Sequence, residues 1–178
     1  MAIYYGDGSN SNGDSSFGGR IVQTVTSMKG GHTSHTGQSW SSNVGGLTSS
    51  ITMKDSNNKI LVLYNVSVSA AANVYSAQIR LLRDSTHLNP GVQGQVNQAI
   101  ANNHYFTSYD SYSSYTFSNM SNGAIDSPGD TNQHTYAIQI RSGYSNYAVY
   151  INRTYNNGNS ENLGTASSFI TLFEIAHS

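Results

Sequence analysis

The sequence contains no cysteine, which excludes a disulfide framework and a thiolate metal site. Only 10% of the 178 residues are charged, and the formal net charge is −1. The Lys and Arg residues are scattered singly, so there is no basic stripe that could neutralise a phosphate backbone. We therefore expect no nucleic-acid partner and a protein that folds without an oxidising compartment.

Long apolar runs are missing as well. No run approaches the roughly 18 to 20 residues that a membrane-spanning helix needs, and the amino terminus has neither the basic nor the apolar region of a signal peptide. These absences predict no membrane association. The abundance of Asn, Ser and Tyr is nevertheless typical of proteins that work outside cells. Folding in a reducing cytosol followed by release on lysis would reconcile the two observations.

The residues that are abundant, namely Gly, Ser, Asn, Thr and Tyr, are typical of β-sheets with polar loops. Proline is rare, with only Pro90 and Pro128 in the chain. At 178 residues the chain is long enough to bury a core without the help of a metal or a disulfide. One compact all-β domain is the expectation.

The first 19 residues differ from the rest. Residues 6–19 (GDGSNSNGDSSFGG) are almost wholly small and polar, and such a segment buries too little apolar surface to offset its ordering entropy. We expect a polar arm at residues 1–19 and a single β-sandwich domain at residues 20–178. The apolar residues at its ends could pin the arm to a partner or to the domain, and a free, disordered arm is the alternative. The candidate docking residues are its apolar side chains, Ile3, Tyr4, Tyr5 and Phe17.

From residue 20 onward, short segments alternate apolar and polar residues with a period of two, which is the pattern of β-strands joined by turns. The clearest of these segments are residues 47–53, 59–69, 75–81, 136–141, 147–151 and 169–176. Residues 136–141 and 147–151 are separated by a short turn and are predicted to form a hairpin. About eight to ten strands without helices indicate an antiparallel two-sheet sandwich such as a jelly roll.

The closing segment, residues 169–176 (FITLFEIA), is apolar on both faces apart from Thr171 and Glu174. A strand that is apolar on both faces lies in the middle of a sheet or at a subunit interface. An apolar face left in water would be an aggregation hazard, so we expect self-association. The candidate interface residues are Phe169, Leu172, Phe173 and Ile175.

No motif in the sequence indicates catalysis or metal binding. His32 and His35 could be a metal pair, but no third ligand is close to them in the sequence. Among the carboxylates that a glycosidase would need, Glu174 lies in an apolar strand and is predicted to form a structural ion pair with a partner such as an arginine. The sequence therefore predicts no enzyme, no catalytic residue, no cofactor and no metal.

Aromatic residues offer one alternative site. Tyr105, Tyr109, Tyr112 and Tyr115 could form a platform on which sugar rings stack, although tyrosine is equally common in sheets and in subunit contacts. The single tryptophan, Trp40, lies among Ser and Gly residues and is predicted to fill the core.

Several segments, taken in their order along the chain, resemble small surface proteins and fibre-tip domains of tailed phages of marine cyanobacteria and related bacteria. These segments are residues 59–63 (KILVL), 79–85 (IRLLRDS), 126–143, 149–154 (VYINRT) and 170–176 (ITLFEIA). The resemblance implies a trimeric jelly roll like that of the tumour-necrosis-factor superfamily, with the terminal strands near the threefold axis.

The resemblance also implies a function. The protein would be a structural component of the virion, displayed on the particle exterior as a capsid-decorating knob or a short tail appendage and anchored by its amino-terminal arm. Its partners would be copies of itself and capsid or tail proteins. The alternative is a tail-fibre tip or a carbohydrate-binding module that recognises host surface polysaccharide.

Overall fold

The computed structural model describes residues 19–70, 76–88, 101–105, 116–156, 158, 161 and 163–177. These residues form strands, turns and loops without any helix, which confirms the all-β prediction. The predicted arm lies outside the described residues except for Gly19. The strands are β1 Ile21–Lys29, β2 Thr33–Thr36, β3 Thr48–Thr52, β4 Lys59–Ala70, β5 Ala77–Arg83, β6 Thr86–His87, β7 Asn103–Tyr105, β8 Ser118–Asp126, β9 Gln133–Ser142, β10 Ala148–Ile151 and β11 Ser168–Ile175.

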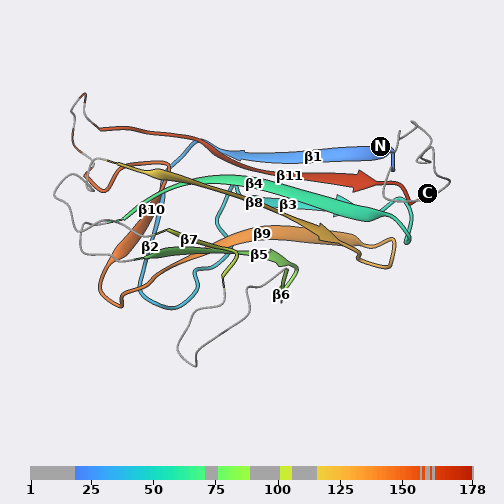
Figure 1. Ribbon diagram of the computed structural model, residues 1–178, viewed down its shortest axis with the longest axis horizontal. Coiled ribbons are helices and arrows are strands. Elements are labelled where there is room, and N and C mark those ends of the chain that lie inside the picture. The colour runs from blue at the N-terminus through green and yellow to red at the C-terminus, as the bar shows by residue number, and fades with distance from the viewer. Residues whose placement is uncertain are drawn as a thin grey trace, which may run out of the picture.

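The strands form two antiparallel sheets, as predicted. The six-stranded sheet has the order β1-β11-β4-β10-β2, with β8 paired to the other edge of β4. The five-stranded sheet has the order β3-β9-β5-β6, with β7 also paired to β5. Figure 1 shows β1, β11 and β4 in an upper layer and β5 and β9 in a lower layer.

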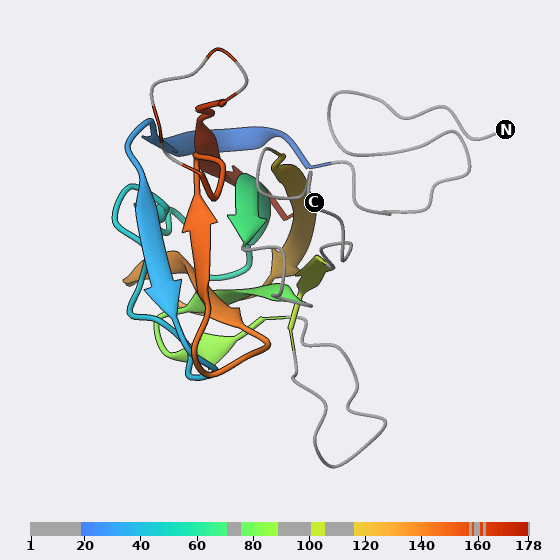
Figure 2. The same cartoon turned by 90° about the vertical axis from the view of Figure 1, so that its left-hand side faces the viewer.

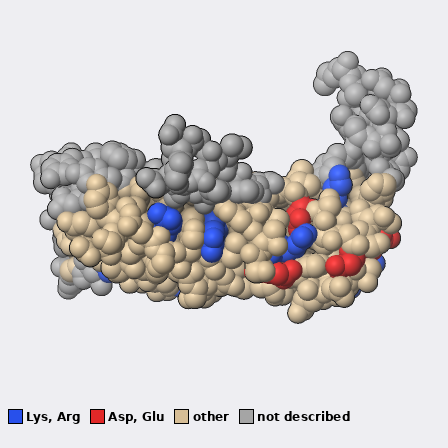
Figure 3. Space-filling model, turned by 90° about the horizontal axis from the view of Figure 1, so that it is seen from below, with Lys and Arg blue, Asp and Glu red and all other residues tan. Residues whose placement is uncertain are grey.

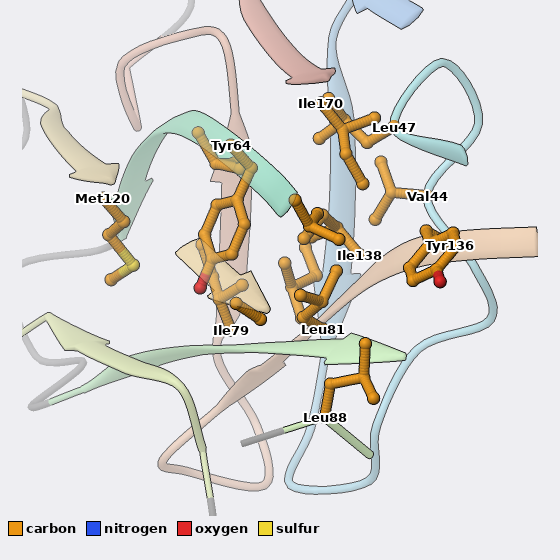
Figure 4. Packing of buried hydrophobic residues seen from close by; sticks show 14 of the residues in the cluster. Val44, Leu47, Tyr64, Ile79, Leu81, Leu88, Met120, Tyr136, Ile138 and Ile170 are labelled. Atoms are coloured by element: carbon orange, nitrogen blue, oxygen red, sulfur yellow. The ribbon is translucent and has the colours of Figure 1, made fainter. Parts of the chain in front are cut away.

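The core fills the space between the two sheets. Alternate residues of β4 face it, and Ile60, Val62, Val66 and Val68 are completely buried, as their two-residue period predicts. Figure 4 shows how the opposite sheet meets them: Ile79 and Leu81 of β5 and Ile138 of β9 project into the same cluster as Tyr64 of β4. The cluster also holds Val44 and Leu47 from the segment before β3.

The predicted hairpin of residues 136–141 and 147–151 is wrong. These residues form β9 and β10, which belong to different sheets, and β10 pairs with β2 and β4 instead. Figure 2 shows β2 in light blue and β10 in orange side by side at one end of the molecule. Val149 and Ile151 of β10 bury their side chains in the core from the sheet opposite β9. Two apolar alternating segments joined by a turn are compatible with either arrangement, since the strands of both sheets face one core.

An arginine, an aspartate and a tyrosine connect β8 of one sheet to β5 and β9 of the other. Asp126 ends β8 and is almost completely buried. Its Oδ1 and Oδ2 accept hydrogen bonds from Arg83 Nη1 at 2.9 and 2.8 Å, and Oδ2 accepts a third from the Tyr136 hydroxyl at 2.7 Å. Burial, and then the neighbouring Asp126 carboxylate, raise the pKa of Tyr136, so this hydroxyl remains a donor.

Glu174 does not have the predicted arginine partner. Its side chain is completely buried, and its carboxylate accepts hydrogen bonds from the side-chain amides of Gln23 and Asn58 and from the Lys54 backbone N–H. Burial alone would raise the pKa of Glu174, but these hydrogen bonds outweigh it and hold the pKa below its ordinary value. Neutral amides thus stabilise the buried charge in place of a cation.

A histidine lies between two aspartates at the end of the molecule where β5 turns into β6. His134 Nδ1 lies 2.9 Å from Asp84 Oδ2, and Nε2 lies 3.0 Å from Asp130 Oδ1. Asp84 has a positive φ of 54° in the turn, and its Oδ1 also accepts the Thr135 backbone N–H. Burial alone would lower the pKa of His134, but the two aspartates outweigh it and raise the pKa above its ordinary value.

Replacement of the buried carboxylate should destabilise the fold. We expect Glu174→Ala to lower the free energy of unfolding by about 2–3 kcal/mol, because it leaves three donors without an acceptor inside the protein. Urea unfolding followed by circular dichroism measures the change. Glu161→Ala removes an exposed carboxylate and should stay within about 0.5 kcal/mol of the wild type. Equal effects of the two variants would contradict this role of Glu174.

The histidine should make stability depend on pH. Because folding raises the pKa of His134, its stabilising contribution is complete below the pKa of the unfolded state and is lost as the pH rises through the higher folded pKa. We expect His134→Gln to lower the midpoint of urea unfolding more at about pH 5.5 than at about pH 8.5. His32→Gln, which removes an exposed imidazole, is the control. An equal loss at both pH values for His134→Gln would contradict the ion pairing.

Candidate functional site

The outer face of the six-stranded sheet is the candidate functional surface, and the alternation of β11 determines which residues face it. Ile170 and Leu172 point into the core, so Phe169, Thr171 and Phe173 point outward. Both phenylalanine side chains are only half-buried in the single chain. Two of the predicted interface residues, Phe169 and Phe173, therefore lie on an outer surface of the domain.

The strand register extends this surface across four strands. Phe173 pairs with Leu61 of β4, and Leu61 pairs in turn with Ile125 of β8. On the other side of β11, Phe169 pairs with Met28 of β1. Apolar side chains from β8, β4, β11 and β1 thus lie in rows across one side of the sheet. We call this outer side of the four strands the apolar face.

Four large side chains of the apolar face are strongly exposed to solvent. They are Met28 (68% exposed), Ile21 (55%), Ile125 (50%) and Leu63 (40%). Most isolated domains keep such contiguous apolar patches small. The exposure of Leu63 shows that this part of β4 is buried on one face only.

A shallow groove of about 410 Å³ crosses the apolar face where β8 meets β4. It is lined by Leu61, Gly123, Ala124 and Ile125. A Cβ atom on Gly123 would lie 2.8 Å from Cδ2 of Leu63, closer than real side chains approach. The glycine therefore lets Leu63 lie across β8, and its missing side chain opens the groove.

The polar groups of the apolar face bond to one another. The hydroxyls of Thr26 and Thr171 lie 3.0 Å apart, and Ser121 Oγ donates to Asn65 Oδ1 at 2.9 Å. Among the described outward positions of β1, β4, β8 and β11, Lys59 is the only charged residue. A second protein surface could cover such a face without leaving these polar groups unsatisfied.

The other two predicted interface residues do not share this exposure. Leu172 is completely buried in the core, which corrects its assignment to the interface. Ile175 lies at the end of β11 opposite Ile21 and is 9% exposed, so it contributes little free surface. A segment that is apolar on both faces does not reveal which face is the inner one. The interface residues predicted from the sequence did not include the exposed Leu63, Ile125 and Met28. The alternation of β4 could have indicated one of them, because it places Leu61 and Leu63 on the side opposite the core.

Most other predicted site residues lie outside the described part of the chain. This holds for the docking residues Ile3, Tyr4, Tyr5 and Phe17 and for Tyr109, Tyr112 and Tyr115 of the sugar platform. Tyr105 ends β7, where its backbone pairs with Ala77 of β5. The glycan assignment of these tyrosines therefore stays a prediction.

The structure locates His35, one of the two histidines weighed as a metal pair, and Trp40, the tryptophan predicted to fill the core. His35 Nε2 lies 2.7 Å from the carbonyl oxygen of Ser39, and the described residues contain no group of three or more His, Cys, Asp or Glu side chains that could hold a metal ion. Trp40 is half-buried and is not part of the core cluster, so the prediction that it fills the core is wrong. It lies instead beside Arg80 and Arg141 on the five-stranded sheet.

Across the described residues, no helix is long and apolar enough to cross a membrane. Comparison of the chain with protein-family models gave no match, and comparison with curated proteins gave none either.

Proposed function

We propose that the protein is a self-associating structural component of a tailed-phage virion, displayed on the particle exterior as a capsid-decorating knob or a short tail appendage. The observation that carries this proposal is the apolar face, which is exposed in the single chain and almost free of charge. The composition supports the same reading, because Asn, Ser and Tyr dominate over Lys and Glu, as in proteins that work outside cells.

The strand order supports a jelly roll. When the short strands β6, β7 and β10 are set aside, β3, β4, β5, β8, β9 and β11 lie alternately in the five-stranded and the six-stranded sheet. Successive strands that cross between two facing sheets are typical of jelly rolls rather than of sandwiches built from hairpins. The first and last described strands, β1 and β11, are neighbours and both contribute to the apolar face. In the family that the sequence resembles, terminal strands of this kind lie near a threefold axis, so we propose a homotrimer.

A second copy of the same chain is the partner that best fits the apolar face. Stable interfaces bury about 800 Å² on each partner, and a face built from four strands offers a broad surface for such a contact. Copies of an almost uncharged surface bring no like charges together when they meet. A different protein partner would more often be selected by complementary charges, which this face lacks.

The proposal assigns structural roles to the carboxylates and no catalytic role to any residue. Glu174 is buried, and both of its carboxylate oxygens accept hydrogen bonds from protein donors. Asp126 connects β8 of one sheet to β5 and β9 of the other. The arm at residues 1–19 would attach the knob to capsid or tail proteins through Ile3, Tyr4, Tyr5 and Phe17.

Function as a tail-fibre tip or carbohydrate-binding module is the second candidate, and the surroundings of Trp40 on the opposite sheet favour it.

A charge placed on the apolar face should break the association. We expect the wild-type chain to form a trimer and Leu63→Lys to form a monomer, because a lysine ammonium at this exposed position would be buried without a partner in the interface. Size-exclusion chromatography with light scattering measures the mass, and circular dichroism verifies that the variant is folded. Ser50→Lys, at an exposed position of β3 on the other sheet, should remain a trimer.

Deletion of residues 1–18 tests whether the association depends on the arm. The trimer should survive the deletion, because the apolar face is built from β1, β4, β8 and β11 alone. A folded wild-type monomer at micromolar concentration would overturn the self-association proposal. A trimer that persists in Leu63→Lys would place the interface elsewhere on the domain.

A further inference from the structure

Two arginines lie beside the single tryptophan on the outer face of the five-stranded sheet. Arg80 projects from β5 and Arg141 from β9, on the side of the sheet opposite the core residues Ile79 and Ile140. Their guanidinium carbons lie 4.7 and 5.6 Å from the centre of the Trp40 ring. All three side chains are half-buried and remain partly accessible to solvent.

The backbone holds Trp40 at the sheet edge. The N–H groups of Ser41 and Val44 donate to the carbonyls of Ile140 and Ile138, both at 2.9 Å, and the Ile140 N–H donates to Ser41 Oγ at 3.1 Å. The segment before β3 therefore continues the edge of the sheet along β9. The tryptophan is fixed beside the arginines by backbone contacts as well as by its ring.

Arg80 is held in one orientation. Its Nε and Nη2 atoms donate to Gln139 Oε1 at 2.8 and 2.6 Å, and Gln139 Nε2 donates in turn to Asn43 Oδ1 at 2.8 Å. Among the described residues, no acceptor is found for Arg80 Nη1. One edge of the guanidinium is thus fixed by the protein while the other edge remains available to a ligand.

No carboxylate neutralises these two arginines within the described residues. The ion pairs found there involve Arg83 and His134 instead. Burial, and then the charge of Arg141, lower the pKa of Arg80, and burial lowers the pKa of Arg141. Figure 3 views this sheet from outside and shows basic side chains without acidic neighbours on one part of the face, whereas the two kinds intermix toward the other end.

At the arginine pair, two buried side-chain atoms have no hydrogen-bond partner among the described residues. They are Gln78 Oε1, an acceptor, and Arg141 Nε, a donor. Gln78 is 7% exposed. It lies directly opposite Arg141 in the pairing of β5 with β9. Buried polar atoms are rarely left unpaired. A hydroxyl group could satisfy both atoms, since it accepts one hydrogen bond and donates another.

We propose that Trp40, Gln78, Arg80 and Arg141 form a binding site for a saccharide that carries a carboxylate. The carboxylate accepts hydrogen bonds from the free edges of the guanidinium groups, and a sugar hydroxyl bridges Gln78 Oε1 and Arg141 Nε after a small displacement of the arginine. The amides of Gln139 and Asn43 extend the polar rim on which further hydroxyls bind.

The chemistry of the site favours a sugar acid over a nucleic acid. A phosphate backbone needs a row of cations, whereas this surface carries an isolated pair in a chain with net charge −1. Neutral amides beside an aromatic ring suit a ligand rich in hydroxyl groups. The inference rests on the second candidate function, the carbohydrate-binding module, and names its ligand class. It does not depend on the self-association proposal, because the site and the apolar face lie on opposite sheets.

The test is a calorimetric titration of the full chain with a tetrasaccharide of galacturonic acid, followed in parallel by intrinsic fluorescence. Because Trp40 is the single tryptophan, a change in its emission locates the ligand at this site. We expect saturable binding that weakens at least about tenfold in Arg141→Gln and in Arg80→Gln, since each variant removes a charge-assisted hydrogen bond.

Arg153→Gln is the matched control. Arg153 also lies over an aromatic ring, 3.9 Å from the centre of Tyr150, but it follows β10 of the other sheet. This variant should bind the saccharide as the wild type does. Leu63→Lys should also bind it, whatever its oligomeric state, so failure of the proposed trimer and failure of this site are distinguishable.

Several outcomes would overturn the inference. Absence of binding at about 1 mM tetrasaccharide would remove the site. Equal affinity for a neutral galactose tetrasaccharide would show that the carboxylate is not recognised. Competition by sodium sulfate at the same concentration as the saccharide would indicate a simple anion site, with an ordered water between Gln78 and Arg141. Undiminished binding in both arginine variants would place the ligand elsewhere.

Discussion

The two-residue alternation of the strands, with one set of side chains sealed between two sheets, is the constraint on which the rest of this structure depends. In β4 the inward residues from Ile60 to Val68 are buried almost completely, and β5, β9 and β11 supply the facing side chains. The charged side chains that are buried at this core accept hydrogen bonds from the protein, which replace the hydrogen bonds they would make to water. Glu174 and Asp126, the buried carboxylates of the described residues, each accept hydrogen bonds from several donors.

The same alternation gives the domain two outer faces of different chemistry. On the six-stranded sheet, Leu61, Leu63 and Phe173 present an almost uncharged surface whose threonine hydroxyls bond to each other. On the five-stranded sheet, Arg80 and Arg141 lie beside Trp40 among neutral amides. The first surface suits association with another protein surface, and the second suits a small anionic ligand. A trimer formed through the apolar face would leave the arginine pair exposed on its outside.

Much of the fold could be predicted from the sequence. The periods of β4 and β11 locate these strands within one residue of their observed bounds, and the period of β9 locates that strand within three residues. The pattern of β11 also identifies Phe169 and Phe173 as candidates for an interface. Predictions that depend on pairing between distant segments were less successful. β9 and β10 do not form a hairpin, and Glu174 finds amides instead of an arginine. Trp40 lies beside arginines of two strands that are remote in sequence, which no local pattern could indicate.

The sequence by itself determined the all-β class, the position of most strands and the set of residues that share a face, because these follow from composition and local periodicity. Only the tertiary structure decided which face of β11 is inner, which strands are neighbours and which side chains meet as sites. The physical reason is that the hydrogen bonds between strands join backbone groups that are the same in every residue. The choice among pairings therefore depends on how the whole set of side chains fills one core.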